Sequence, residues 1–263
     1  GLGDTKLLGV LEDQAQTTEV KDLFKTDDFI DFCTWTRKWY QDGIINPDAN
    51  VVTDGGKQSI FGSAQGWPAA ATTWAFNNGI DKYDLTQVFG PMYATGTIQG
   101  SMNAISANSK YKAEALKVLE LMNTDSKFRD MCAYGTEGNY MEYSEDGTVQ
   151  KLRDDWNWPS YTQGTFFILS TQTDGDPDAW EQVKKQNETA VSSTCLGFAL
   201  DITDIQNEVA NCNMVWDKYK NDMLTGATDP ETAVPACIEE LKAAGLDKVI
   251  EEAQRQIDEF FAK

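Results

Sequence analysis

Residues 229–261 read DPETAVPACIEELKAAGLDKVIEEAQRQIDEFF, and this stretch determines the class of fold that we expect. Its apolar residues recur at helical spacing on both sides of Gly245, which is typical of two consecutive helices separated by a glycine. The second helix is predicted to follow that glycine directly. Pro235 would distort the first helix unless it lay in the first turn, so we expect that helix to begin near Thr232.

A third helical pattern precedes this pair. It begins near Ile205, continues through Val209, Cys212 and Tyr219, and stops near Gly226. The last part of the chain is therefore predicted to be a run of three helices.

Earlier segments alternate between helical and extended patterns. Thr26 caps a predicted helix over DDFIDFCTWTRKWYQ, and two more helices are expected in SKYKAEALKVLELMN from Ser109 and in TDSKFRDMCAY from Thr124. Strands are expected in KLLGVL and in LTQVFGPM, the latter ending at Pro91. This alternation indicates an α/β protein with a large share of helix.

Composition excludes several classes of function. Forty-two acidic and 22 basic side chains give a net charge of −20, which repels phosphate backbones and anionic lipid, so no nucleic-acid partner is expected. The chain contains no histidine, which excludes imidazole-based catalysis and His-containing zinc motifs. The five cysteines are widely spaced without a CxxC pair, so we expect small core residues and neither a metal nor a cofactor.

The sequence has no apolar run of the roughly 18 to 20 residues that a membrane span needs. The first residues, GLGDTKLLGV, lack the basic and apolar regions of a signal peptide. This abrupt start is compatible with a processed protein or with a fragment of a longer one.

Four segments together resemble a known family. They are FKTDDFIDFCTWTRKWYQDGIINPDA, MNAISANSKYKAEALKVLELMNTD, YGTEGNY and the stretch from CLGFALDITDIQNEVANC to EEAQRQIDEF. In this order they are similar to the second half of bacterial extracellular solute-binding lipoproteins that deliver carbohydrates to ABC transporters. The last segment is the most specific of the four.

The resemblance implies a two-lobed, helix-rich α/β fold of the periplasmic-binding-protein-like class (type II), represented here by its C-terminal half. Residues 1–92 are expected in one lobe with a hinge strand at their end, residues 93–155 in the other lobe, and residues 156–263 in the first lobe again. Because most of the N-terminal lobe would lie outside this chain, we expect the 263 residues alone to bind saccharide weakly or not at all.

The resemblance also implies a function. The protein would capture a carbohydrate, with an oligosaccharide as the expected ligand, and deliver it to a membrane permease. It would be a monomer and would have no enzymatic activity. It would act outside the cell, anchored by a lipid on a cysteine upstream of Gly1.

Candidate ligand-binding residues are aromatic rings and one carboxylate in Gly-rich or polar loops. Rings offer apolar faces to the C–H side of a sugar, and an ionised glutamate accepts hydrogen bonds from hydroxyls. These candidates are Trp67, Glu137, Tyr140, Trp156, Trp158 and Tyr161. Glu137 could instead bond the N–H groups of its own loop. Four other tryptophans follow helical patterns and are expected in the core: Trp35, Trp39, Trp180 and Trp216.

Two alternatives from other classes stay open at this point. A glycoside hydrolase would need two carboxylates about 5 to 9.5 Å apart, for which Glu137 and either Asp154 or Asp155 are the candidates. A non-catalytic surface interaction protein would have neither a small-molecule ligand nor a permease partner.

Overall fold

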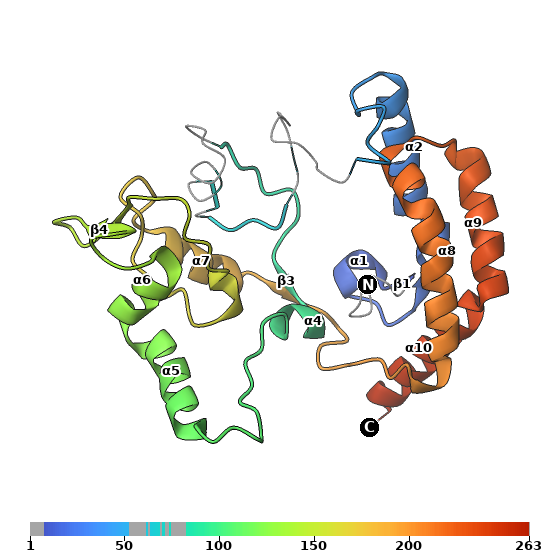
Figure 1. Ribbon diagram of the computed structural model, residues 1–263. Helices are drawn as coiled ribbons and strands as arrows, with labels where there is room; N and C mark the ends of the chain where they lie inside the picture. The colour runs from blue at the N-terminus through green and yellow to red at the C-terminus, as the bar shows by residue number, and fades with distance from the viewer. Residues whose placement is uncertain are drawn as a thin grey trace. The chain divides into compact units, whose positions relative to one another are not determined.

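The computed structural model describes residues 8–52, 62, 64–68, 70–71, 74 and 83–262. The described residues form two compact units (Figure 1). Unit 1 comprises those within 1–60, 92–97 and 192–263, and unit 2 comprises those within 61–91 and 98–191. No helix of the described residues has both the length and the apolar character that crossing a membrane requires.

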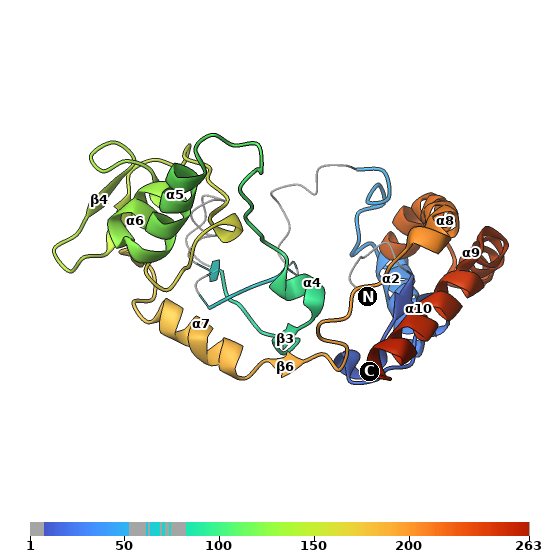
Figure 2. The same ribbon diagram turned by 90° about the horizontal axis from the view of Figure 1, so that it is seen from below.

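Unit 1 is dominated by four helices that contribute to its main apolar core. They are α2 (Asp27–Gln41), α8 (Gln206–Thr225), α9 (Pro230–Ala244) and α10 (Leu246–Phe261). Both views show α8 and α9 packed beside α2 (Figures 1 and 2), and α10 contacts α8 and α9. Smaller elements precede them: β1 (Gly9–Val10), the left-handed turn of α1 (Glu12–Ala15), β2 (Lys21–Asp22) and the 3-10 turn Leu23–Lys25.

The three C-terminal helices are confirmed, with one corrected boundary. Helix α9 begins at Pro230 and not near Thr232, because the carboxylate of Asp229 accepts from the backbone N–H of Glu231 and proline is favourable at the first helical position. Pro235 consequently lies inside the helix. The helix continues past this residue although proline removes one backbone hydrogen bond.

One glycine allows two helices of unit 1 to approach each other closely. Gly226 ends α8 with φ +74°, and a Cβ at this position would lie 2.3 Å from the carbonyl oxygen of Thr36 in α2. The Arg37 guanidinium donates to the carbonyls of Gly226 and Ala227 at 2.9 and 3.2 Å. The end of α8 is therefore fixed against α2 by both close packing and capping.

The buried face of α2 differs from the predicted one. Thr26 caps the helix as expected, since its hydroxyl accepts from Phe29 N, but the buried stripe is Phe29, Cys33 and Thr36. Trp35 and Trp39 are 56% and 42% exposed, so their expected place in the core was wrong. Apolar residues occur around much of this helix, and periodicity alone could not select which stripe packs against α8.

The cysteines behave as small apolar residues. All five are free thiols, and Cys33, Cys212 and Cys237 are buried in the main core of unit 1. Burial raises the pKa of Cys33 and Cys212 to about 11 and that of Cys237 to about 12. These thiols remain protonated and unreactive at neutral pH.

The described residues of unit 2 form helices, a hairpin and long irregular segments. Its elements are α5 (Lys112–Thr124), α6 (Ser126–Tyr134), β4 (Met141–Tyr143), β5 (Val149–Lys151), the 3-10 turn Ser160–Thr162 and α7 (Ala179–Glu188). Strands β4 and β5 are antiparallel, with Tyr143 opposite Val149. The core of this unit contains Tyr134, Met141, Val149 and Leu169, with Trp180 packed against it.

Short segments link the units in sequence. Strand β3 (Met92–Tyr93) pairs with β6 (Val191–Ser192), and α4 (Thr95–Ile98) follows β3. The strand expected over LTQVFGPM is wrong, because the described backbone becomes extended and paired only after Pro91, at Met92.

The expected boundary near residue 155 also differs from the structure. Residues 156–191 belong to unit 2, and so do the described residues within 61–91. The reason is polar anchoring: side chains of α6 hold the backbone of residues 160–170. Such loop-to-helix hydrogen bonds have no periodic sequence pattern.

Candidate functional site

The loop YGTEGNY connects α6 to the β4–β5 hairpin of unit 2. Helix α6 ends at Tyr134, and Gly135 follows with φ +92°. A Cβ on Gly135 would lie 2.5 Å from the Cβ of Tyr140, so only glycine allows the loop to fold back on its own tyrosine. The sequence thereby places Tyr140 directly beside the start of the loop.

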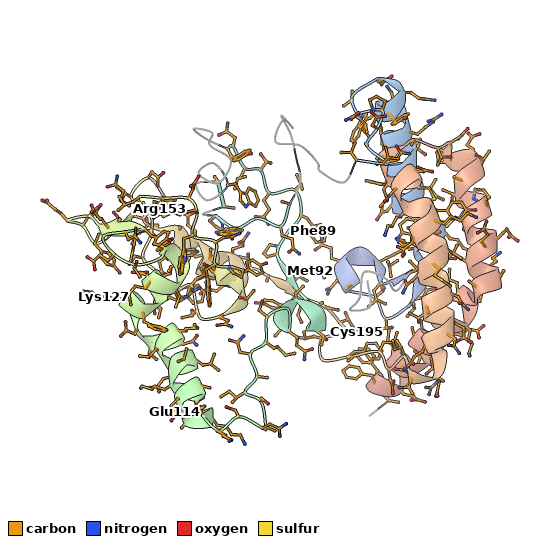
Figure 3. All side chains as sticks on the ribbon, in the orientation of Figure 1. Phe89, Met92, Glu114, Lys127, Arg153 and Cys195 are labelled. Atoms are coloured by element: carbon orange, nitrogen blue, oxygen red, sulfur yellow. The ribbon has the colours of Figure 1, made fainter. Side chains whose placement is uncertain are left out.

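The Tyr140 ring is the centre of a small aromatic and polar surface. Trp156 lies 5.3 Å away between ring centroids at an interplanar angle of 56°, and the Arg153 guanidinium lies 4.7 Å from the centroid of Tyr140. The indole of Trp156 is held in place, since its N–H donates to the carbonyl of Cys132 at 3.0 Å. Figure 3 shows Arg153 at the hairpin end of this unit.

Glu137 lies in the exposed part of the same loop. Within the described part of the chain its carboxylate forms no hydrogen bond or ion pair, although its backbone makes an isolated bridge to Met141. The expectation that Glu137 bonds the N–H groups of its own loop therefore finds no support among these residues. An ionised carboxylate in this position has its acceptor capacity free for a ligand.

Arg153 is the residue that sequence reasoning missed. Its Nε donates to Asp155 at 2.9 Å, a second nitrogen also bonds Asp155, and Nη1 donates to Asn139 at 3.2 Å. The Asp155 hydrogen bond raises the pKa of Arg153, and the same bond lowers the pKa of Asp155. The arginine before two aspartates in KLRDDW was the available sequence signal, because a guanidinium next to consecutive carboxylates can form charge-assisted hydrogen bonds with them.

The other three candidates have different environments. Tyr161 is 72% exposed in the 3-10 turn, whereas Trp158 is half-buried and its indole N–H is buried without a hydrogen-bond partner among the described residues. Trp67 is half-buried and makes an edge-to-face contact with Trp74 at 5.7 Å. The structure thus brings Tyr140 and Trp156 together, next to the loop of Glu137.

The electrostatics of this surface make one carboxyl group, Asp155, unsuited as the proton donor of a glycoside hydrolase. A glycoside hydrolase needs one carboxyl group whose pKa is raised so that it can donate a proton. Asp155 has the opposite environment, because the hydrogen bond from Arg153 lowers its pKa and favours its ionised form. The described residues also contain no group of carboxylates and thiols that could hold a metal ion.

Comparisons with known proteins test the predicted resemblance of the chain. Residues 194–262 match a family model described as "Domain of unknown function (DUF3502)". A curated relative, a carbohydrate ABC transporter substrate-binding protein of Streptococcus pneumoniae serotype 4, is 29% identical over 170 residues. These residues are 62% of this chain and 35% of the relative. The predicted resemblance to carbohydrate-transporter solute-binding proteins is confirmed.

Solved structures show the same relationship at the level of the fold. The N-glycan transport solute binding protein (NgtS) from Streptococcus pneumoniae superimposes with a TM-score of 0.84 at 24% identity, covering 98% of this chain and 60% of that protein. The same protein in complex with Man5GlcNAc gives a TM-score of 0.76. The chain therefore has the helix-rich α/β fold of periplasmic-binding-protein-like solute-binding proteins, as predicted, and spans less than two thirds of their length.

Proposed function

We propose that the protein is the substrate-binding component of a carbohydrate ABC transporter, which captures an oligosaccharide and delivers it to a membrane permease. The observation that carries this proposal is the surface in unit 2 where the Tyr140 and Trp156 rings lie 5.3 Å apart beside the exposed loop of Glu137. Aromatic faces and a free carboxylate together suit a ligand with C–H faces and hydroxyl groups.

The substrate class follows from the relatives. Because the N-glycan transport solute binding protein has been solved in complex with Man1GlcNAc and with Man5GlcNAc, we propose a mannose- and N-acetylglucosamine-containing oligosaccharide as the ligand. Trp67, Trp158 and Tyr161 would extend the contact surface beyond the central pair. We propose no catalytic role; Asp155 beside this surface is unsuited as a proton donor, because the hydrogen bond from Arg153 lowers its pKa.

The remaining parts of the proposal concern location and assembly. We propose that the protein acts outside the cell as a monomer, anchored by a lipid attached outside residues 1–263. The net charge of −20 supports this location, because such a charge keeps a tethered protein soluble and opposes direct contact with anionic lipid. We also propose that the two units belong to two lobes and that β3 and β6 form hinge segments between them.

A pair of matched substitutions tests the site in the full-length protein. Glu137→Gln removes an ionised acceptor, and a hydrogen bond to a charged group contributes roughly 1.5 to 3 kcal/mol, so affinity for Man5GlcNAc should fall about tenfold to a hundredfold. The control Glu142→Gln makes the same change at an exposed position of β4 and should leave affinity within about twofold. Isothermal titration measures both.

Trp67→Ala tests the outer part of the site in the same assay. If Trp67 stacks on the sugar, affinity falls while the melting temperature is retained, because the residue lies in a loop and not on a helix stripe. A lower melting temperature with unchanged affinity would assign Trp67 to packing against Trp74. Unchanged affinity in both Glu137→Gln and Trp67→Ala would remove both residues from the site.

A further inference from the structure

Helix α6 carries two adjacent charged residues that are almost completely buried. Arg129 and Asp130 are each 1% exposed. Burying an ionised side chain costs free energy unless hydrogen bonds or opposite charges compensate it. The partners of these two residues therefore show what the helix holds.

Arg129 holds the segment that follows Trp156. Its Nε donates to the carbonyl of Thr165 at 3.0 Å, its Nη2 donates to the carbonyl of Ser160 at 2.9 Å, and its guanidinium lies 5.2 Å from the centroid of Phe166. Burial lowers the pKa of Arg129, although arginine stays charged at any physiological pH. The planar fork spans two carbonyls at once, which fixes the spacing between them.

Asp130 holds two different elements. Its Oδ1 accepts from Ser170 N at 2.9 Å, and its Oδ2 accepts from the Ser170 hydroxyl at 2.8 Å and from the Tyr143 hydroxyl at 2.9 Å. Burial, with the Asp130 hydrogen bond, raises the pKa of Tyr143, so this hydroxyl remains a donor. Tyr143 belongs to β4, which begins directly after Tyr140.

Two more contacts tie the same segment to α5 and α6. Tyr134 donates its hydroxyl to the carbonyl of Ser170 at 2.8 Å. Gly164 has φ +73°, and a Cβ there would lie 2.7 Å from the carbonyl oxygen of Met122. The segment approaches the helices so closely that a side chain at Gly164 has no room.

We propose that Arg129 and Asp130 are positioning residues for the saccharide surface: they fasten residues 156–170 and the β4–β5 hairpin to one helix and so fix the Trp156 and Tyr140 rings relative to each other. This inference rests on the proposed function. Neither residue is exposed enough to touch a ligand, so both act through the segments that they hold. Because hydrogen bonds from buried charges are directional, they restrict these irregular segments to one conformation.

The experiment compares Arg129→Gln with Lys127→Gln in the full-length protein. Lys127 is exposed on the same helix (Figure 3), so the control removes the same charge without touching the buried contacts. Backbone hydrogen exchange without sugar is read on peptides covering 156–170, and affinity for Man5GlcNAc is read by titration. Arg129→Gln should raise exchange in this segment and weaken binding about tenfold or more, whereas Lys127→Gln should change neither by more than about twofold.

Two conservative variants guard against simple misfolding. Arg129→Lys keeps the charge but not the planar fork, so its exchange and affinity should lie between those of wild type and Arg129→Gln. Tyr143→Phe removes only the hydroxyl that bonds Asp130, and it should raise exchange in residues 141–151 while unit 1 keeps its protection.

Each outcome bears on the proposal. Unchanged exchange in residues 156–170 of Arg129→Gln overturns it whatever the sugar result. Raised exchange with wild-type affinity also overturns it, because the pair would then hold a segment outside the site. If wild type itself does not bind the sugar, the proposed function fails and the positioning role with it, while raised exchange would still identify the anchoring contacts as real.

Discussion

The two units of the chain are stabilised in different ways. The main core of unit 1 consists largely of apolar side chains and thiols from α2, α8, α9 and α10. Unit 2 has a smaller apolar core and adds the buried Arg129 and Asp130, whose hydrogen bonds reach backbone in irregular segments. Apolar packing is non-directional and suits helices whose apolar residues recur periodically. Directional hydrogen bonds from buried charges can hold segments that have no regular secondary structure. The candidate site lies in the unit whose anchoring charges, Arg129 and Asp130, are almost completely buried.

The largest expected effect is the loss of core packing in unit 1. Leu241 of α9 is completely buried, so Leu241→Ala should reduce the free energy of unfolding by about 2 to 5 kcal/mol. The control Leu224→Ala, at an exposed position of α8, should change it by less than about 1 kcal/mol. Urea unfolding measures both, and hydrogen exchange should place the loss in unit 1. A loss in unit 2 of equal size would contradict the view that each unit has its own core.

Gly226 tests the close approach of α8 and α2. Gly226→Ala forces a side chain into a left-handed conformation and against the Thr36 carbonyl, so it should destabilise by about 1 to 3 kcal/mol. Gly138 has a similar φ of +77°, but a Cβ at this position would meet no atom within 4 Å, which makes Gly138→Ala the matched substitution in unit 2. A smaller thermal shift for Gly138→Ala is expected; equal shifts would show that close packing at Gly226 contributes nothing.

Helix caps allow the same substitution in both units. Asp229 caps α9 through Glu231 N at 3.0 Å, and Asp125 caps α6 through Phe128 N at 2.9 Å. Each Asp→Ala change should cost about 1 kcal/mol, because each removes one acceptor from an otherwise unpaired N–H group. Chemical denaturation gives the values. Since α6 carries the anchoring residues, only Asp125→Ala should also weaken sugar binding. If Asp229→Ala weakened sugar binding equally, the site would not depend on α6 in particular.

The smallest expected effect is electrostatic and lies on the surface of α10. Hydrogen bonds from Arg255 and then Gln256 lower the pKa of Glu252 from 4.5 to about 2. A carboxyl group with a depressed folded-state pKa stabilises the fold above about pH 4.5 and loses this contribution as the pH falls towards 2. Glu252→Gln should therefore narrow the gap in melting temperature between pH 7 and pH 3. High salt should reduce the difference, because the Arg255 partner is exposed to solvent.

The sequence by itself determined the helices of unit 1 and the class of fold. Capping residues, glycine stops and the spacing of Leu246, Val249, Ala253 and Ile257 specify α10 locally, and α8 and α9 follow the same rules. The resemblance carried by residues 195–260 then predicted the fold that the relatives share. Local rules succeed here because a helix is stabilised by contacts within a few residues.

Only the tertiary structure decided which faces and loops come together. Residues distant in sequence decide three features: which stripe of α2 is buried, the contact between the Tyr140 and Trp156 rings, and the position of Arg153 against Tyr140. The same holds for residues 160–170, whose backbone is held by Arg129 and Asp130 from positions 31 to 40 residues earlier in the chain. Hydrogen bonds from a side chain to distant backbone groups follow no period in the sequence, so their partners become visible only when the chain has folded.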